Sequence, residues 1–92
     1  MALTKETVVD KIEVLEMGQV QVRTATRVLE DGVELSSSFH RHVVEPSTKT
    51  DDTWADTDIS GEDARVQAIA TATWTSAVKT AYQEMMDANA TP

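Results

Sequence analysis

The sequence predicts an α+β fold: a three-stranded antiparallel β-meander covered on one face by a C-terminal αα-hairpin. Two observations predict the meander. Apolar and polar residues alternate between Val8 and Val44, and glycine marks two tight turns, at Glu16-Met17-Gly18 and at Asp31-Gly32. A third observation predicts the helices, because apolar residues recur at three- and four-residue spacing after Ser60.

The Asp31-Gly32 turn predicts the register of the second hairpin. Asp-Gly between apolar runs favours a two-residue type I′ loop, because both central residues of that turn need positive φ. Such a loop sets Glu30 opposite Val33. A regular ladder then pairs Val28 with Leu35, Thr24 with Phe39 and Val20 with Val43. A three-residue loop would set Val28 against Glu34 and is rejected.

The first hairpin is predicted to have a three-residue loop that ends in Gly18. A two-residue loop would set Ile12 against Arg23 and divide the apolar residues between the two faces. The longer loop pairs Ile12 with Val22. The three strands then share one apolar face beneath the helices, made of Ile12, Val14, Val20, Val22, Val28, Val33, Leu35, Phe39 and Val43.

The opposite face of the predicted sheet is polar and is expected to meet solvent. Its residues are Lys11, Glu13, Gln21, Arg23, Arg27, Glu34, His40 and His42. Arg41 is the one break in the apolar face, since the predicted register places it inward, opposite Val22. From there its aliphatic stem could carry the charge to solvent.

Residues 46–60 are predicted to form a long acidic loop, because Pro46 stops the third strand and turn-forming residues follow. Trp54 lies in the middle of this loop. Either it folds back over the helices or it anchors a partner, since tryptophan is favoured at interfaces. Asp56–Gly61 matches the opening of an EF-hand calcium loop, but Gln67 stands where a bidentate glutamate is needed. A solvated loop without metal is therefore favoured.

The chain is predicted to be one small domain with a modest core. Met1 to Thr7 is expected to be a frayed lead-in, Ser60 to cap the first helix, and Thr75 to cap the second. The predicted organisation is a single domain over 1–92, with the meander at 8–45, the loop at 46–60, and helices at 61–73 and 76–88.

Composition narrows the class of function. The net charge is −8, without a basic stripe, so direct binding of nucleic acid is not expected. There is no cysteine, which removes disulfides, thiolate metal sites and a cysteine nucleophile. No apolar run has the length of a membrane span, and the N-terminus lacks the pattern of a signal peptide. We therefore expect synthesis in the cytoplasm and no membrane partner.

Candidate contact residues lie on the third strand and in the loop. His40 and His42 could share a metal ion, but Arg23 lies opposite and no third ligand is evident. Ser38 and His40 point the same way, yet no oxyanion loop or nucleophile elbow accompanies them, so an enzyme is not expected. Open sheet edges are pairing sites. The sequence predicts an interface at Trp54, Ser38, His40 and His42, and no catalytic, metal or cofactor site.

Several stretches carry a resemblance that covers most of the chain: Met1–Lys5, Val9–Glu16, Gln21–Arg27, Glu30–Gly32, Phe39–Val44 and Gly61–Ile69. In these stretches the sequence resembles a mostly uncharacterised family of small proteins encoded in tailed-phage and prophage genomes. It departs from the family pattern in loop 46–60, which is longer here. The resemblance implies a phage origin, and by analogy of kind a virion part in the tail, baseplate or head.

The combined expectation is a non-enzymatic virion structural or assembly protein, made in the host cytoplasm and located in the virion. It would act through contacts with other virion proteins, as a homo-oligomer or within a hetero-assembly. The alternative is a small acidic intracellular accessory protein, such as an inhibitor of a host enzyme or an assembly chaperone. The presence or absence of the chain in purified particles distinguishes the two.

Overall fold

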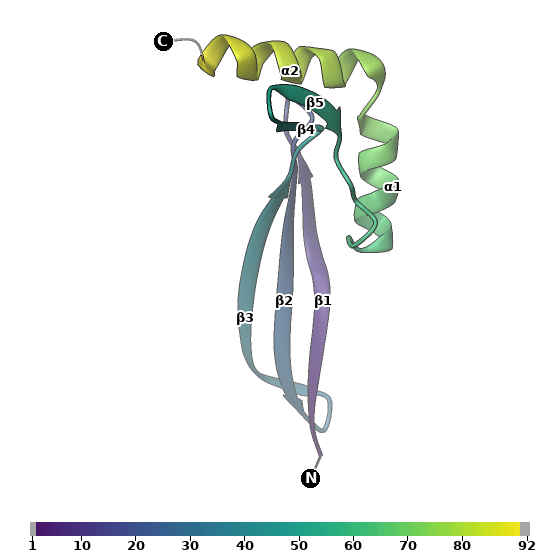
Figure 1. The fold of residues 1–92 in the computed structure, drawn as a ribbon. Helices are drawn as coiled ribbons and strands as arrows, with labels where there is room; N and C mark the ends of the chain where they lie inside the picture. The colour runs from purple at the N-terminus through teal and green to yellow at the C-terminus, as the bar shows by residue number, and fades with distance from the viewer. Residues whose placement is uncertain (1, 91–92) are drawn as a thin grey trace.

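The computed structural model describes residues 2–90 and has the predicted α+β fold, with a meander, a second small sheet and two C-terminal helices. The meander is a long ribbon with the helices at one end, and the molecule extends over 57 × 28 × 23 Å (Figure 1). The elements are β1 (Leu3–Val14), β2 (Val20–Glu30), β3 (Val33–Val44), β4 (Ser47–Thr50), β5 (Thr53–Asp56), α1 (Ala64–Thr73) and α2 (Ser76–Ala90).

The ribbon is longer than predicted at its N-terminal end. The expectation of a frayed lead-in up to Thr7 is wrong from Leu3 onward, because β1 begins there and Leu3 pairs with Glu30 at the far end of β2. Met1, the first residue of that expected lead-in, lies outside the described residues. Threonine and valine are frequent in this stretch, and β-branched residues favour the extended backbone. The first strand therefore pairs with the whole length of its neighbour.

The first hairpin has the predicted register. Val14 pairs with Val20 and Ile12 with Val22, and Gly18 has φ of +89° in the turn. The Gly18 amide donates a hydrogen bond to the Leu15 carbonyl at 3.0 Å. A β-bulge at Asp10, which sequence analysis did not predict, shifts the pairing farther along the ribbon.

The second hairpin has the predicted turn but a different register beyond it. Asp31 and Gly32 have φ of 51° and 83°, and Glu30 pairs with Val33. A bulge at Leu35 then adds one residue to β3. The predicted partners of Val28, Thr24 and Val20 are therefore wrong by one position. The observed pairs are Val28 with Ser36, Thr24 with His40 and Val20 with Val44.

The bulge changes which residues of β3 face the helices. Val22 pairs with His42 rather than with Arg41, and Arg41 pairs with Arg23 on the opposite face. The predictions that His40 and His42 face outward and that Arg41 faces inward are wrong, as is the inward placement of Phe39 and Val43. The bulge avoids burying a guanidinium against valine, which would carry a large desolvation cost.

The main core cluster occupies the helical end of the ribbon, and Ala25 and Tyr82 are buried outside it. Its fully packed members are Val20, Val22, Val44, Val66, Ala70 and Trp74, with Val9, Ile12, Ile59 and Val78 packed against them. Within residues 2–90, this cluster contains no residue of β2 beyond Val22 and none of β3 before Val44. α1 therefore covers one end of the sheet face rather than its whole length, and α2 lies across the end of the ribbon against β4 (Figure 1).

The segment predicted as a loop contains a second hairpin. β4 and β5 pair through a turn at Asp51 and Asp52, which have φ of 50° and 63°. Threonine and tryptophan favour strands, and aspartate tolerates the left-handed conformation of this turn better than most residues. The prediction of 46–60 as one irregular loop is therefore wrong for the eight residues of β4 and β5.

Both helices lie close to their predicted positions. α1 begins at Ala64, three residues later than predicted, because the Asp63 side chain rather than Ser60 caps it by accepting a hydrogen bond from the Arg65 amide at 2.9 Å. The predicted cap of α2 is confirmed, since Thr75 Oγ1 accepts from the Val78 amide at 3.3 Å. Within residues 2–90, neither helix combines the length and apolar character needed to cross a membrane.

A buried contact between Trp74 and Gly18 joins the helices to the ribbon. Trp74 follows α1, and its Nε1 donates a hydrogen bond to the Gly18 carbonyl at 2.7 Å. A Cβ added at Gly18 would lie 2.6 Å from Val78 Cγ1 and 3.1 Å from Pro46 Cγ. Gly18 is therefore needed for its positive φ and for the close approach of α2.

Gly18 and Gly32 form a matched pair for testing this contact. Both have positive φ, but within residues 2–90 nothing lies within 4 Å of a Cβ added at Gly32. We predict that Gly32→Ala lowers the free energy of unfolding by about 1 kcal/mol through backbone strain alone. Gly18→Ala should lower it by about 3 kcal/mol or more, because the clash with Val78 adds to the strain. Urea denaturation measures both, and equal losses would contradict the close approach.

Candidate functional site

The site that the structure builds around a predicted residue is centred on Trp54. Trp54 lies on β5 and is half-buried against α2, where its ring meets Tyr82 edge to face at a centroid distance of 6.0 Å. Its Nε1 donates a hydrogen bond to Asp87 Oδ2 at 3.2 Å. Trp54 therefore folds onto a helix, as the first of the two interpretations expects, and its role at an interface stays a prediction.

Lys49 completes this cluster from β4. Its Nζ donates to Asp87 Oδ1 at 2.9 Å and lies 5.5 Å from the centre of the Trp54 ring. Lys49 is opposite Trp54 in the β4–β5 register, so the hairpin delivers both side chains to one carboxylate of α2. This cluster thus contributes an ion pair, a hydrogen bond and an aromatic contact to the attachment of the small sheet to α2, which the Lys79–Asp56 and Gln83–Ser47 contacts complete.

The charges of the cluster are mutually stabilised. The hydrogen bond from Lys49, and then that from Trp54, hold the pKa of Asp87 below its usual value. The same bond to Asp87 raises the pKa of Lys49. Burial raises the pKa of Tyr82 to about 12, and the neighbouring Glu45 carboxylate adds to this rise. Tyr82 therefore stays neutral across the physiological range.

A hollow of about 270 Å³ lies beside the cluster, between the β4–β5 hairpin and α2. Its lining residues are Glu45, Thr48, Lys49, Trp54, Tyr82, Met86 and Asp87. It offers two aromatic rings, a thioether and a rim of charged groups. A pocket with this lining can hold an apolar or charged group of another molecule.

The predicted contact residues of β3 are separate from this cluster. Ser38, His40 and His42 lie on the sheet face that carries Val22, in a row that runs from the core toward the ribbon tip. His40 and His42 stack with ring centroids 6.2 Å apart, and His42 Nε2 lies 2.7 Å from Glu62 Oε1. Ser38 follows on the same face of the strand and is exposed. The structure therefore groups Ser38, His40 and His42 but separates them from the Trp54 cluster.

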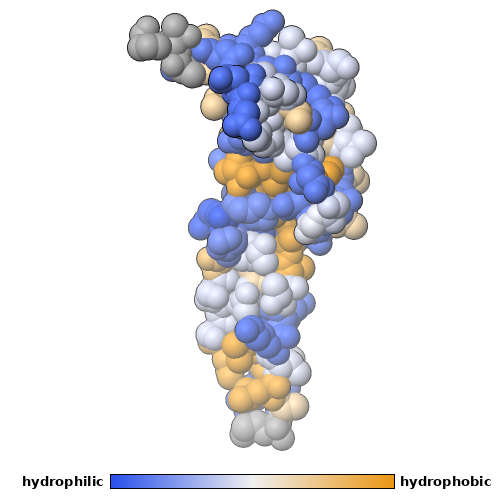
Figure 2. Space-filling view, in the orientation of Figure 1, coloured by the Kyte–Doolittle hydropathy of each residue, from blue (hydrophilic) through white to orange (hydrophobic). Residues whose placement is uncertain are grey.

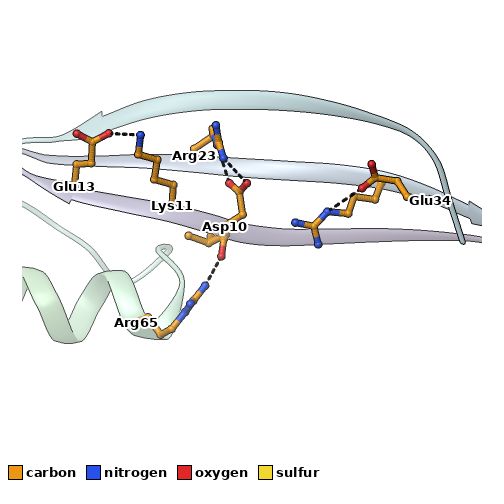
Figure 3. Close-up of polar contacts among 8 residues, drawn as sticks. Asp10, Lys11, Glu13, Arg23, Glu34 and Arg65 are labelled. Atoms are coloured by element: carbon orange, nitrogen blue, oxygen red, sulfur yellow. Dashed lines mark hydrogen bonds and ion pairs between the residues drawn. The ribbon is translucent and has the colours of Figure 1, made fainter. Parts of the chain in front are cut away.

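The opposite face of the ribbon carries a row of ion pairs (Figure 3). Arg23 donates to both carboxylate oxygens of Asp10, at 3.0 and 2.8 Å, and its guanidinium stacks over Phe39 at 4.5 Å. Lys11 pairs with Glu13 at 2.9 Å, also in Figure 3. The hydrogen bond from Arg23 lowers the pKa of Asp10. This face is therefore polar, as predicted, although Phe39 and Val43 interrupt it.

Sequence reasoning missed the partners that fix these side chains. Asp87 and Glu62 lie far along the chain from Trp54 and His42, so no spacing linked them. The bulge at Asp10 could have been predicted from the sequence. The alternation of apolar and polar residues is interrupted at Val8, Val9 and Asp10, as it is where a strand contains an extra residue.

The acidic loop residues that resembled a calcium site are engaged in other contacts. Asp56 accepts from Lys79 at 2.9 Å, and Asp58 Oδ1 accepts from the Ser60 amide at 2.9 Å. That backbone hydrogen bond lowers the pKa of Asp58. Across residues 2–90, no group of three or more histidine and acidic side chains is placed to hold a metal ion.

Comparisons with protein-family models, with curated proteins and with solved structures found no match.

Asp87→Asn tests the Lys49–Asp87–Trp54 cluster through its pH dependence. The folded-state pKa of Asp87 is lowered, so its contribution to stability is present above the usual value of 3.8 and is lost as the pH falls through the lowered value. We predict that Asp87→Asn loses less stability than the parent chain between about pH 6 and about pH 3. Urea midpoints at the two pH values measure this loss. The exposed turn substitution Glu16→Gln is the control, and a parent-like slope in Asp87→Asn would contradict the assignment.

Proposed function

We propose that this protein is a non-enzymatic structural or assembly component that works through contacts with other proteins. Following the resemblance described above, we propose that its setting is a tailed-phage virion, as part of the tail, baseplate or head. The observation that supports the proposal is the length of ribbon that extends beyond the core. The resemblance supplies the phage setting.

A three-stranded sheet normally needs a layer packed on its apolar face. Within residues 2–90 the ribbon beyond the core cluster has no such layer, and four large apolar side chains lie exposed on its two faces. Leu3, Val33, Leu35 and Phe39 keep 64, 65, 56 and 50% of their surface accessible, and apolar surface gathers at the ribbon tip (Figure 2). Burial of these side chains by a neighbouring protein would supply the stabilisation that the ribbon lacks.

The charge of the surface indicates the kind of neighbour. With a net charge of −8, the chain would be repelled by phosphate backbones. On the row of ion pairs, Arg23 and Arg27 face carboxylates of the same chain. The exposed groups are therefore better suited to protein surfaces, where apolar contacts and edge pairing provide the binding energy.

The ribbon tip provides a test of this function in the phage that encodes the chain. We predict that mass spectrometry of gradient-purified particles detects the chain. The double substitution Val33→Ser and Leu35→Ser should lower its incorporation about tenfold or more, because two exposed contacts lose their apolar surface.

Val14→Ser is the matched control, since Val14 is also exposed, at 48%, but lies at the helical end. Circular dichroism checks that all variants fold. If the chain is absent from purified particles but co-purifies with a host enzyme, the virion proposal is wrong and the acidic accessory protein replaces it.

A further inference from the structure

We propose that β3 is a self-association edge, which pairs antiparallel with β3 of a second copy to form a continuous six-stranded sheet. This inference rests on the proposed function, assembly through protein contacts, and names the surface and the partner. It starts from the difference between the two edges of the meander.

The β1 edge is occupied and protected. Arg65 of α1 donates a hydrogen bond to the Val9 carbonyl, and α1 runs beside β1 in Figure 1. Lys5 and Lys11 and the bulge at Asp10 also lie on this strand, and lysines and bulges oppose edge pairing.

The β3 edge is open. Every residue from Val33 to Arg41 is exposed, and this stretch contains neither lysine nor proline. Beyond the bulge at Leu35, β3 stays in regular register with β2 as far as Val44. Its free side therefore presents the repeating amide and carbonyl groups that an added strand requires.

The charges on β3 favour a second copy in the antiparallel direction. The strand is acidic near its start, at Glu34, and basic near its end, at Arg41. Antiparallel self-pairing brings the start of one strand to the end of the other, so opposite charges meet twice. Parallel pairing would set like charges together, and directly opposed like charges are destabilising.

In one register of this pairing, the oppositely charged side chains lie opposite each other and on the same face of the sheet. With a two-fold axis at Ser38, Ser36 of one copy lies opposite His40 of the other. The bulge at Leu35 then shifts the pairing by one residue, as it does against β2, and brings Glu34 opposite Arg41. Both side chains lie on the face of the ion-pair row, because Glu34 pairs with Leu29 and Arg41 with Arg23.

The residues near the proposed axis also fit. Phe39 is half-exposed on the ion-pair face, and this register makes the two Phe39 rings diagonal neighbours, which is within the reach of aromatic side chains. Within residues 2–90, Arg41 has neither an ion pair nor a side-chain hydrogen bond. Its neighbour Arg23 is already held by Asp10 at 2.8 Å. Glu34 lies 3.5 Å from Arg27 Nε of its own chain and stays half-exposed, so in the dimer its carboxylate would bridge Arg27 and the Arg41 of the second copy.

The overall shape allows this pairing. Both helices lie at the end of the ribbon where β3 finishes (Figure 1). α1 is on the side of β1, whereas α2 crosses beyond the end of the strands toward the side of β3 and leaves the length of the β3 edge below it uncovered (Figure 1). In an antiparallel pair the helical ends therefore point in opposite directions, and each ribbon tip lies beside the upper part of the other copy's β3.

A charge exchange tests the register in the purified full-length chain. Arg41→Glu and Glu34→Arg should each raise the dimer dissociation constant about tenfold or more, since each disrupts two symmetry-related pairs. The double substitution should restore dimerisation by re-forming the pairs in reverse. Sedimentation velocity over micromolar to millimolar concentrations measures this. Lys5→Glu and Glu16→Arg are controls with the same charge changes away from the edge and should leave the dimer unchanged.

A cross-link tests the symmetry axis. The natural chain has no cysteine, so Ser38→Cys introduces a single thiol at the proposed axis and should give a disulfide-linked dimer on oxidation. Thr7→Cys is the matched control, because Thr7 and Ser38 pair with the same residue, Thr26, from opposite edges.

A chain that remains monomeric at millimolar concentration, a dimer that ignores both charge reversals, or equal cross-linking at Thr7 would overturn the inference. A monomer that is still incorporated into particles would remove this dimer but leave the proposed function. A Ser38-centred dimer in a chain that is absent from particles would support the self-association edge but contradict the proposed function.

Discussion

The fold depends on one buried contact, in which the Trp74 indole donates its hydrogen bond to the Gly18 carbonyl while Val78 packs against the same glycine. This contact joins the first turn of the ribbon to the junction of α1 and α2. Pro46, which leads from β3 to β4, packs on Gly18 as well. Four parts of the chain therefore meet at a residue without a side chain. The core cluster beneath α1 extends from this point and ends a few residues down the ribbon.

The elements that could be predicted from sequence are those defined by local chemistry. Gly18 and the Asp31-Gly32 pair occupy backbone conformations that most residues avoid, so they placed both turns correctly. Thr75 was identified as a helix cap for a similarly local reason. The pairing of Ile12 with Val22 followed because the apolar residues of both strands agree with only one loop length.

The register of β3 could not be predicted in the same way. Ser36, Ser37 and Ser38 have no preference for either face, so nothing in that stretch signalled the extra residue at Leu35. The consequence appears only at the end of the strand, where both Arg41 and His42 were available to face Val22. Desolvation favours the histidine, which reaches Glu62 at 2.7 Å, but the sequence does not bring Glu62 near. The partner of Trp54 was hidden for the same reason, since Asp87 lies 33 residues away.

The separation in sequence between Gly18 and Trp74 also has a consequence for the order of folding. The two turns of the ribbon close loops of two or three residues, whereas the contact that docks the helices joins residues 56 positions apart. During synthesis the ribbon emerges from the ribosome before either helix exists. We expect its strands to pair early and the helical layer to dock last. The nascent chain would therefore pass through a stage in which Val20, Val22 and Val44 of the ribbon are not yet covered by the helices. Pulsed hydrogen exchange during refolding would detect this stage, through amides of the ribbon protected earlier than those of α1.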